Sequence, residues 1–140
     1  CYQVNVWVGL TNGAHDMAIG KVTRNIGPTK VDLTTKVEAV IDGQVSVRST
    51  SSFEMNLPQS LLITGTAGSI ATGNGEAFST WREPTSLRIN ERVEHFASVD
   101  AFVAMTEAVS DHLAGGPGWM LPLSESLRVA QILDQIAASA

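Results

Sequence analysis

The alternation of apolar and polar side chains between residues 33 and 42 is the feature that most constrains the fold. Its inward-facing positions are Leu33, Thr35, Val37, Ala39 and Ile41. A period of two is what a half-buried β-strand requires. Asp42-Gly43 follows, and this pair favours a type I′ turn because both central positions need a positive φ. Since Val45 and Val47 continue the alternation, the sequence predicts an antiparallel hairpin here.

The other segments in the first two-thirds of the chain also favour β-structure. In residues 2–8, Tyr2, Val4, Val6 and Val8 fall on one face of an extended segment, which predicts a strand. Gly65-Thr66-Ala67-Gly68 and Gly73-Asn74-Gly75 are turn signals between apolar runs, so the strands form a meander. Segment 11–28 opens with a turn signal, ends in Gly-Pro and gives mixed signals between them. We interpret this segment as an insertion after the first strand.

The last third changes to a helical period. Apolar residues recur at intervals of three and four from Val99 to Leu113, which predicts an amphipathic helix capped by Ser98. The run Gly115 to Gly118 ends this helix. A second helix, capped by Ser124, runs to the end of the chain.

These elements define an α+β fold with an open, mainly antiparallel β-sheet (a meander) and two C-terminal helices on one face. We expect residues 1–140 to form a single domain. The other sheet face, carrying Trp, Val and Leu, is left for a partner. Because the chain begins at Cys1 inside a predicted strand, we interpret it as an excised domain of a longer protein.

Composition removes several function classes. The formal net charge is −5, which disfavours nucleic-acid binding because phosphate contacts need clustered Lys and Arg. No apolar run approaches the roughly 18 residues of a membrane span. A single cysteine, Cys1, excludes an internal disulfide and a cysteine zinc site.

No motif predicts a catalytic, cofactor-binding or metal site within the chain. The glycines of segment 73–75 are followed by Phe78 where a dinucleotide fingerprint needs Gly, and segment 65–69 lacks the lysine of a phosphate loop. The three histidines, His15, His95 and His112, show no metal-ligand spacing. His112 is instead placed where a helix C-terminus favours a cation.

Trp81 and Arg82 are the candidate substrate-binding residues. An indole beside a guanidinium can stack on, or clamp, an anionic ligand. The alternative is core packing by Trp81 with a solvated Arg82.

The order of these pieces resembles a known family. A hairpin at Asp42-Gly43, a Gly-x-x-Gly turn at Gly65 and Gly68, a helix over 96–113 and a closing helix over 124–139 occur in this order. The arrangement resembles the C-terminal domain of the Gfo/Idh/MocA oxidoreductases, over roughly residue 30 to the end. The family's N-terminal Rossmann domain, its Glu-Lys-Pro segment and the helix with its catalytic Asp and His lie outside this chain.

The resemblance implies a function for a larger parent protein. The parent would be an NAD(P)-dependent oxidoreductase, with NAD or NADP in the Rossmann domain and a sugar, polyol or related hydroxyl/carbonyl substrate. This chain would bind substrate and form a homo-oligomer through its exposed sheet face, without a cofactor or activity of its own. The parent would be cytoplasmic, with no membrane or nucleic-acid partner.

Two alternatives stay open. The chain could be a non-catalytic sugar-sensing or scaffolding module of the same fold. It could also be an unrelated ligand-carrying α+β domain, which would have a curved, closed sheet around an internal pocket.

Overall fold

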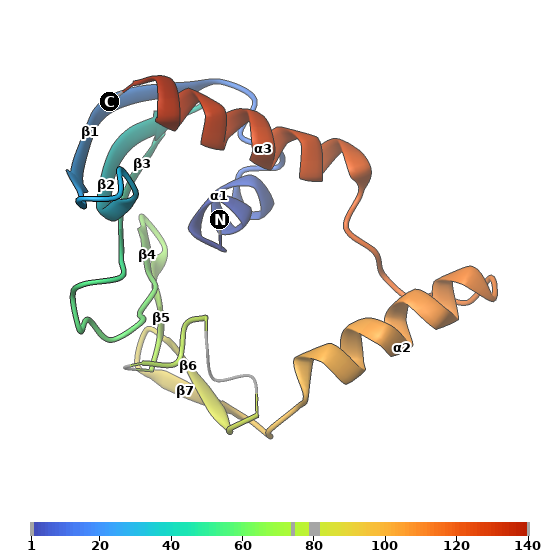
Figure 1. Cartoon of the computed structure of the whole chain (residues 1–140). Coiled ribbons are helices and arrows are strands. Elements are labelled where there is room, and N and C mark those ends of the chain that lie inside the picture. Colours follow the sequence, from blue (N-terminus) through green and yellow to red (C-terminus); the bar gives the residue numbers. More distant parts are fainter. Residues whose placement is uncertain (1, 74, 79–81, 140) are drawn as a thin grey trace. The chain divides into compact units, whose positions relative to one another are not determined.

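The computed structural model describes residues 2–73, 75–78 and 82–139 (Figure 1). The elements are α1 Tyr2–Leu10, β1 Met17–Ile26, β2 Asp32–Ile41, β3 Val45–Ser52, β4 Leu62–Gly65, β5 Gly68–Thr72, β6 Thr85–Ile89, β7 Arg92–Phe96, α2 Ala101–Leu113 and α3 Leu123–Ala138. The α+β class, the antiparallel strands and the two C-terminal helices are confirmed.

The strands are divided between two sheets rather than one meander. Their orders are β1-β2-β3 and β4-β5-β6-β7, and all pairs are antiparallel. The chain correspondingly splits into two compact units. Unit 1 comprises residues 1–56 and 121–140, and unit 2 comprises residues 57–120.

The hairpin predicted at Asp42-Gly43 is confirmed. Strands β2 and β3 pair with Ile41 opposite Val45. Asp42 and Gly43 have φ values of 50° and 66°, the left-handed conformations that this turn requires. The alternation also predicts the buried face, because Val37, Ala39 and Ile41 are all buried.

The strand predicted over residues 2–8 is wrong, because these residues form helix α1. Val4, Trp7 and Val8 are its buried residues. Positions 4 and 8 share one face in a strand and also in a helix, so the valine alternation fits both. Trp7 decides between them, since burying it together with Val4 and Val8 requires the helical spacing.

One hydrophobic core joins α1, β2 and α3 in unit 1. Its buried members are Val4, Trp7, Val8, Ala14, Val37, Ile41, Val129, Ile132 and Ile136. Helices α1 and α3 therefore cover the inner face of the three-stranded sheet (Figure 1).

Segment 11–28 is not an insertion, because it supplies β1, which pairs with β2 along its length. The preceding loop is held by Arg128 of α3. Its guanidinium donates to the carbonyl oxygens of Ala14 (Nε–O 2.9 Å) and His15 (Nη2–O 3.1 Å). Ala14 is fully buried with φ 47°, so this clamp fixes a strained turn beside the core.

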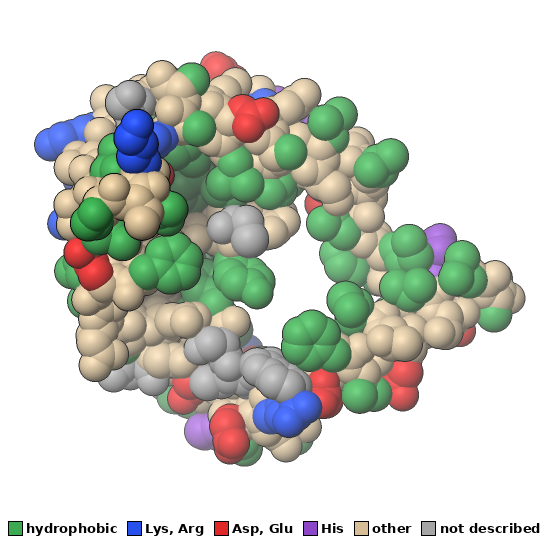
Figure 2. Space-filling view, viewed as in Figure 1, with side chains coloured by type: hydrophobic (Ala, Val, Ile, Leu, Met, Phe, Trp, Pro, Cys, Tyr) green, Lys and Arg blue, Asp and Glu red, His purple; other side chains and the backbone are tan. Residues whose placement is uncertain are grey.

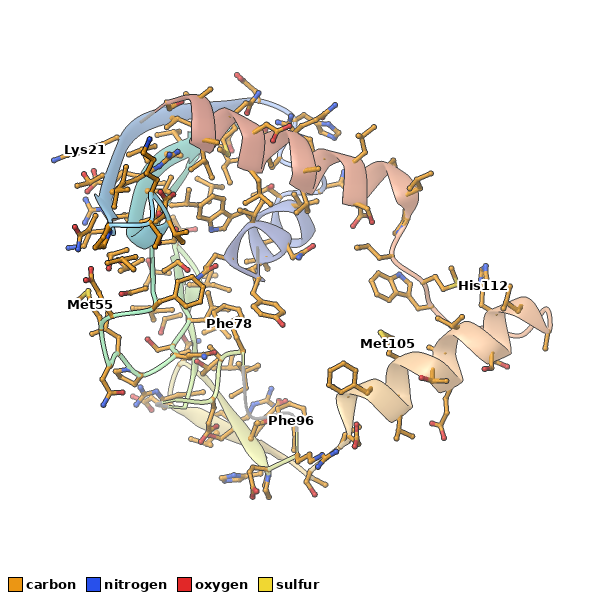
Figure 3. The ribbon with its side chains drawn as sticks, in the orientation of Figure 1. Lys21, Met55, Phe78, Phe96, Met105 and His112 are labelled. Atoms are coloured by element: carbon orange, nitrogen blue, oxygen red, sulfur yellow. The ribbon has the colours of Figure 1, made fainter. Side chains whose placement is uncertain are left out.

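The outer face of this sheet is mainly polar, with Val40 as an exposed apolar residue on it. Lys21, Glu38 and Arg48 lie opposite one another across the three strands, and Thr23, Lys36 and Thr50 form the next row. Lys21 points away from α1 and α3, the helices of the same unit (Figure 3). The expected face carrying Trp, Val and Leu is therefore not found on this sheet.

The sheet of unit 2 has an apolar face instead. Ile63, Ile70 and Ile89 lie opposite one another across β4, β5 and β6. Leu87 shares this face because it is two residues from Ile89. The predicted turn at Gly65–Gly68 joins β4 to β5. Asn74 of the next predicted turn lies outside the described residues.

Helix α2 begins later than predicted. Asp100, not Ser98, is its N-cap, and its Oδ1 accepts hydrogen bonds from the N–H groups of Phe102 (3.0 Å) and Val103 (3.3 Å). A carboxylate also suits the positive end of the helix better than a hydroxyl. Gly115 ends the helix with φ 83° in a Schellman arrangement, in which Gly116 N–H bonds to the carbonyl of Asp111.

The apolar stripe of α2 is exposed. None of its described residues is buried. Figure 2 shows hydrophobic side chains along this helix, and Figure 3 labels Met105 and His112 on it. Helix α3 begins at Leu123 after Pro122, which makes no side-chain cap bond, so the predicted Ser124 cap is wrong.

Candidate functional site

Arg24 on β1 joins the sheet to the end of α3. Its Nη2 donates to the carbonyl oxygens of Ile136 (3.1 Å) and Ala137 (2.9 Å). Helix α3 has no basic residue in its own last turn. Arg24 therefore supplies the cation that the negative end of a helix favours. It donates to the Ala137 carbonyl and adds a second donor to the Ile136 carbonyl, which also accepts from the Ser139 N–H at 3.3 Å.

Arg24 also forms an ion pair with Asp32 at the start of β2. Arg24 Nε lies 3.4 Å from Asp32 Oδ2, while Thr35 Oγ1 donates to the same oxygen at 3.4 Å. Arg24 Nε is nevertheless buried without a hydrogen-bond partner. The two charges are thus close enough to attract, but the Nε–H does not point at the carboxylate. This leaves one buried donor that a further oxygen atom could satisfy.

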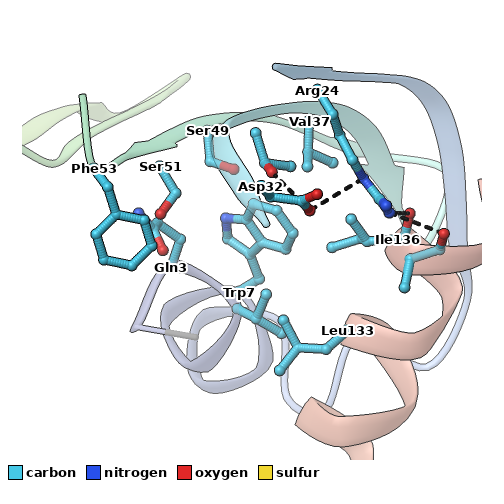
Figure 4. A pocket seen from close by; sticks show the side chains of 13 residues that line it. Gln3, Trp7, Arg24, Asp32, Val37, Ser49, Ser51, Phe53, Leu133 and Ile136 are labelled. Carbon is cyan, nitrogen blue, oxygen red and sulfur yellow. Dashed lines mark hydrogen bonds and ion pairs between the residues drawn. The ribbon is translucent and has the colours of Figure 1, made fainter. Parts of the chain in front are cut away.

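A cavity of about 250 Å³ lies beside this pair, entirely within unit 1 (Figure 4). It lies between α1, the inner face of the sheet and the end of α3. Polar side chains gather on its wall: Gln3, Arg24, Asp32, Thr35, Ser49 and Ser51. The apolar part of the wall is formed by Val4, Trp7, Val37, Phe53, Leu133, Ile136 and Ala137.

The strand geometry explains why hydroxyl groups gather here. Ser49 and Ser51 are two residues apart on β3, so they lie on one face of the sheet. Thr35 lies opposite Ser51 in the register of β2 and β3. Paired residues on adjacent strands point to the same side, so the three hydroxyls share one face of the sheet and line the cavity together with Trp7.

The cavity can bind a small polar ring. Aromatic side chains offer apolar surface to ring C–H groups, and a few placed polar groups fix orientation. Pockets for drug-sized ligands usually begin at about 300 Å³, so this cavity suits one ring rather than a nucleotide.

Glu54 lies at the end of β3 in a separate polar cluster. Asn25 Nδ2 (2.6 Å) and Thr34 Oγ1 (2.7 Å) both donate to its Oε1. The Asn25 bond, then the Thr34 bond, lower the pKa of the Glu54 carboxyl, against a smaller opposing effect of desolvation. Because Thr34 faces away from the core, this cluster ties β1 to β3 on the outer side of the sheet.

The predicted substrate residues Trp81 and Arg82 are not part of this cavity's wall. Trp81 lies outside the described residues. Arg82 belongs to unit 2, where its Nε lies 3.3 Å from Oδ2 of Asp100, the N-cap of α2. A ligand anion at Arg82 would compete with that carboxylate. Substrate binding by this pair stays a prediction.

The other residues singled out by sequence are placed as follows. His112 lies in the last turn of α2, as expected for a cation at a helix C-terminus, with Nδ1 3.1 Å from the carbonyl oxygen of Gly118. His15 and His95 are exposed. Within the described part of the chain, no group of three metal-ligating side chains is found. Cys1 lies outside the described residues.

No described helix is long and apolar enough to cross a membrane.

The cavity residues could not be recognised as a group from the sequence. They come from α1, three strands and α3, and Arg24 bonds to a residue 112 positions away. The available local signal was the row of small hydroxyl residues at 49–52, which interrupts an otherwise apolar alternation.

No protein-family model and no curated protein matches the chain. Solved structures do match it. They are structures of KijD10, a 3-ketoreductase from Actinomadura kijaniata, in complex with NADP and TDP-benzene (TM-score 0.77, 17% identity) or with NADP (TM-score 0.74, 19% identity). The match covers 99% of this chain but only 44% and 45% of those chains.

This likeness is one of fold. The chain spans less than half of the length of the structures that it matches. The chain therefore has the fold of one part of a 3-ketoreductase, and the resemblance inferred from sequence is confirmed at the level of the fold. Further matched structures are variants of that enzyme in which a lysine or a tyrosine is replaced.

Proposed function

We propose that this chain is the substrate-binding part of an NADP-dependent reductase acting on a ketone of the sugar or polyol class. The observation that carries the proposal is the match of the whole chain to under half of an NADP-bound 3-ketoreductase. Nicotinamide cofactors are commonly held by a dinucleotide-binding fold with a glycine-rich turn, and this sequence has no such fingerprint. We therefore propose that the cofactor domain lies in a preceding part of a longer protein.

The cavity of unit 1 supports the substrate class. Three hydroxyls, the Gln3 amide and the Arg24–Asp32 pair can bond to ligand hydroxyl groups, while Trp7 and Phe53 provide apolar surface. A sugar or polyol has this combination of many hydroxyl groups and apolar C–H surface.

Tyr2 is the residue that we propose as proton donor in the reduction. Hydride addition to a ketone leaves an alkoxide that must receive a proton, and a phenol can supply it. Tyr2 is the chain's one tyrosine, is 62% exposed and precedes the cavity residue Gln3 at the start of α1. A matched structure of the 3-ketoreductase is a variant in which a tyrosine is replaced by phenylalanine.

We further propose that the protein self-associates through the apolar sheet face of unit 2. The row Ile63, Ile70 and Ile89 supports this, with Ile70 37% exposed. The polar outer face of the other sheet does not fit this role. The parent protein would act in the cytoplasm with its own Rossmann domain as the second partner.

Steady-state kinetics of the longer gene product test the proposal. The substrates are ketoses and keto sugars, and NADPH oxidation is the readout. Gln3→Ala removes one hydrogen bond from the cavity and should raise KM about 2- to 10-fold with little change in kcat. Gln131→Ala, an exposed position on α3, is the matched control. Tyr2→Phe should instead lower kcat.

Two outcomes would contradict the proposal. NADPH oxidation that no added ketone stimulates would exclude a reductase of this class. Sugar binding by the longer product without any NADPH binding would favour the non-catalytic sensing module instead.

A further inference from the structure

The charges around the unit 1 cavity nearly cancel. Arg24 contributes one positive charge and Asp32 one negative charge, 3.4 Å apart. The C-terminus of α3 presents Ile136 and Ala137 to the cavity, and the N-terminus of α1 presents Gln3. These helix ends carry opposite partial charges of roughly half an elementary charge each. The cavity wall therefore presents no net positive charge to a ligand.

The Arg24 guanidinium is also committed to protein groups. Its Nη2 donates to the carbonyl oxygens of Ile136 and Ala137 in the last turn of α3, and its Nε lies near Asp32 without a hydrogen bond. Both faces by which a guanidinium forms two parallel bonds to a carboxylate or a phosphate include Nη2. With Nη2 occupied, Arg24 can offer a ligand single hydrogen bonds only.

We infer that this cavity selects an uncharged sugar or polyol ring and rejects anionic ones, and that Asp32 is the residue that sets this selectivity. The inference rests on the proposed function and adds the charge of the ligand to it. Asp32 acts by neutralising Arg24 and by repelling a ligand carboxylate at the same wall. The overall charge of −5 acts in the same direction at longer range.

Asp32→Asn is the variant that isolates this role. The amide keeps the shape of the side chain, and its Oδ1 can still accept the Thr35 hydroxyl, which lies 3.4 Å from Asp32 Oδ2. Arg24 stays anchored to α3 by its two carbonyl bonds. The cavity wall then carries one net positive charge. Asp134→Asn makes the same charge change at an exposed position of α3 and serves as the control.

The probes are matched sugars that differ in a primary alcohol or a carboxylate: glucose with glucuronate, galactose with galacturonate, and mannose with mannuronate. Binding to the 140-residue chain is followed by the NMR signal of the Trp7 indole N–H, which Trp7→Phe assigns. We expect a neutral sugar to bind the wild type at least about tenfold more tightly than its uronate, the difference that one charge-assisted hydrogen bond makes. Asp32→Asn should shift this ratio about tenfold toward the uronate, and Asp134→Asn should leave it unchanged.

Three results would overturn the inference. These are equal binding of both members of a pair by the wild type, an unchanged ratio in Asp32→Asn, or no response of Trp7 to any of the sugars. The wild-type ratio decides even if the variant does not fold. Ketone reduction by the longer product together with equal binding of neutral and anionic sugars would overturn this inference alone, whereas neutral-sugar binding without ketone reduction would overturn the proposed function alone.

Discussion

Replacing Arg24 should weaken unit 1 more than its partly exposed surface suggests. Arg24→Ala removes both bonds to the terminal carbonyls of α3, at 3.1 Å and 2.9 Å, and leaves Asp32 without its partner. The end of α3 then has no cation, because its own last turn contains no basic residue. The last turn of α3, which carries the core residue Ile136, should fray first.

The size of the loss follows from these contacts. A hydrogen bond from a charged donor contributes about 1.5–3 kcal/mol. The lower end applies here, because the Ala137 bond is exposed and its carbonyl can be rehydrated. Removing Arg24 Nε, which is buried without a hydrogen bond, offsets the loss by about 1 kcal/mol. The lost ion pair adds at most about 1 kcal/mol, since the Asp32 side chain is 41% exposed. The expected net destabilisation is about 2–3 kcal/mol.

Urea unfolding of the 140-residue chain measures this effect. Trp81→Phe and Trp119→Phe in the background leave Trp7, which belongs to unit 1, as the fluorescent probe. Arg24→Lys keeps the positive charge but loses the planar set of guanidinium donors, so its stability should lie about halfway between those of the wild type and Arg24→Ala. Arg48→Ala, an exposed arginine on the outer face of the sheet, should change stability by less than about 0.5 kcal/mol. If Arg24→Ala unfolds at the same urea concentration as Arg48→Ala, the role given to Arg24 is wrong.

Three further predictions follow from the same contacts. Ile132 is fully buried, whereas Leu127 of the same helix is 58% exposed. In urea unfolding, Ile132→Ala should lower the free energy of unfolding by about 2–5 kcal/mol and Leu127→Ala by less than about 0.5 kcal/mol. Similar losses for the two variants would contradict the core assignment. Glu54 has a lowered pKa, so its contribution to stability is present above its ordinary pKa and is lost as the pH falls through the lowered value. An NMR titration of the Glu54 carboxyl that finds an ordinary or raised pKa would refute the bonds from Asn25 and Thr34. Ile70→Lys should turn an oligomer into a monomer in light scattering over a dilution series, whereas Val40→Lys on the polar sheet face should not; an oligomer that survives Ile70→Lys would exclude the unit 2 face.

Local signals were enough to predict some elements. The hairpin at Asp42-Gly43 needs two adjacent residues with positive φ, and an Asp-Gly pair is the residue combination that favours them. The buried face of β2 follows from its alternation, and the end of α2 follows from its glycine run. Such features depend on neighbouring residues, so sequence reasoning reaches them.

Other elements depend on contacts between distant residues. Segment 2–8 has β-branched residues that favour a strand, yet packing of Trp7 against the core makes it helical. The cavity needs α1 and the end of α3 to meet the sheet, and Arg24 reaches 112 positions along the chain to do so. No periodicity carries that information. Likewise, the N-cap is Asp100 rather than Ser98 because α2 begins two residues later than predicted.

Separate titrations of the 140-residue chain with NADPH and with neutral sugars test the central claim most directly. The claim is that this chain holds the substrate site while a preceding domain holds the cofactor. It predicts saturable binding of a neutral sugar, seen at the Trp7 indole signal, and no NADPH binding. Saturable NADPH binding by the isolated chain, or no sugar binding while Trp7 remains in a folded core, would contradict it.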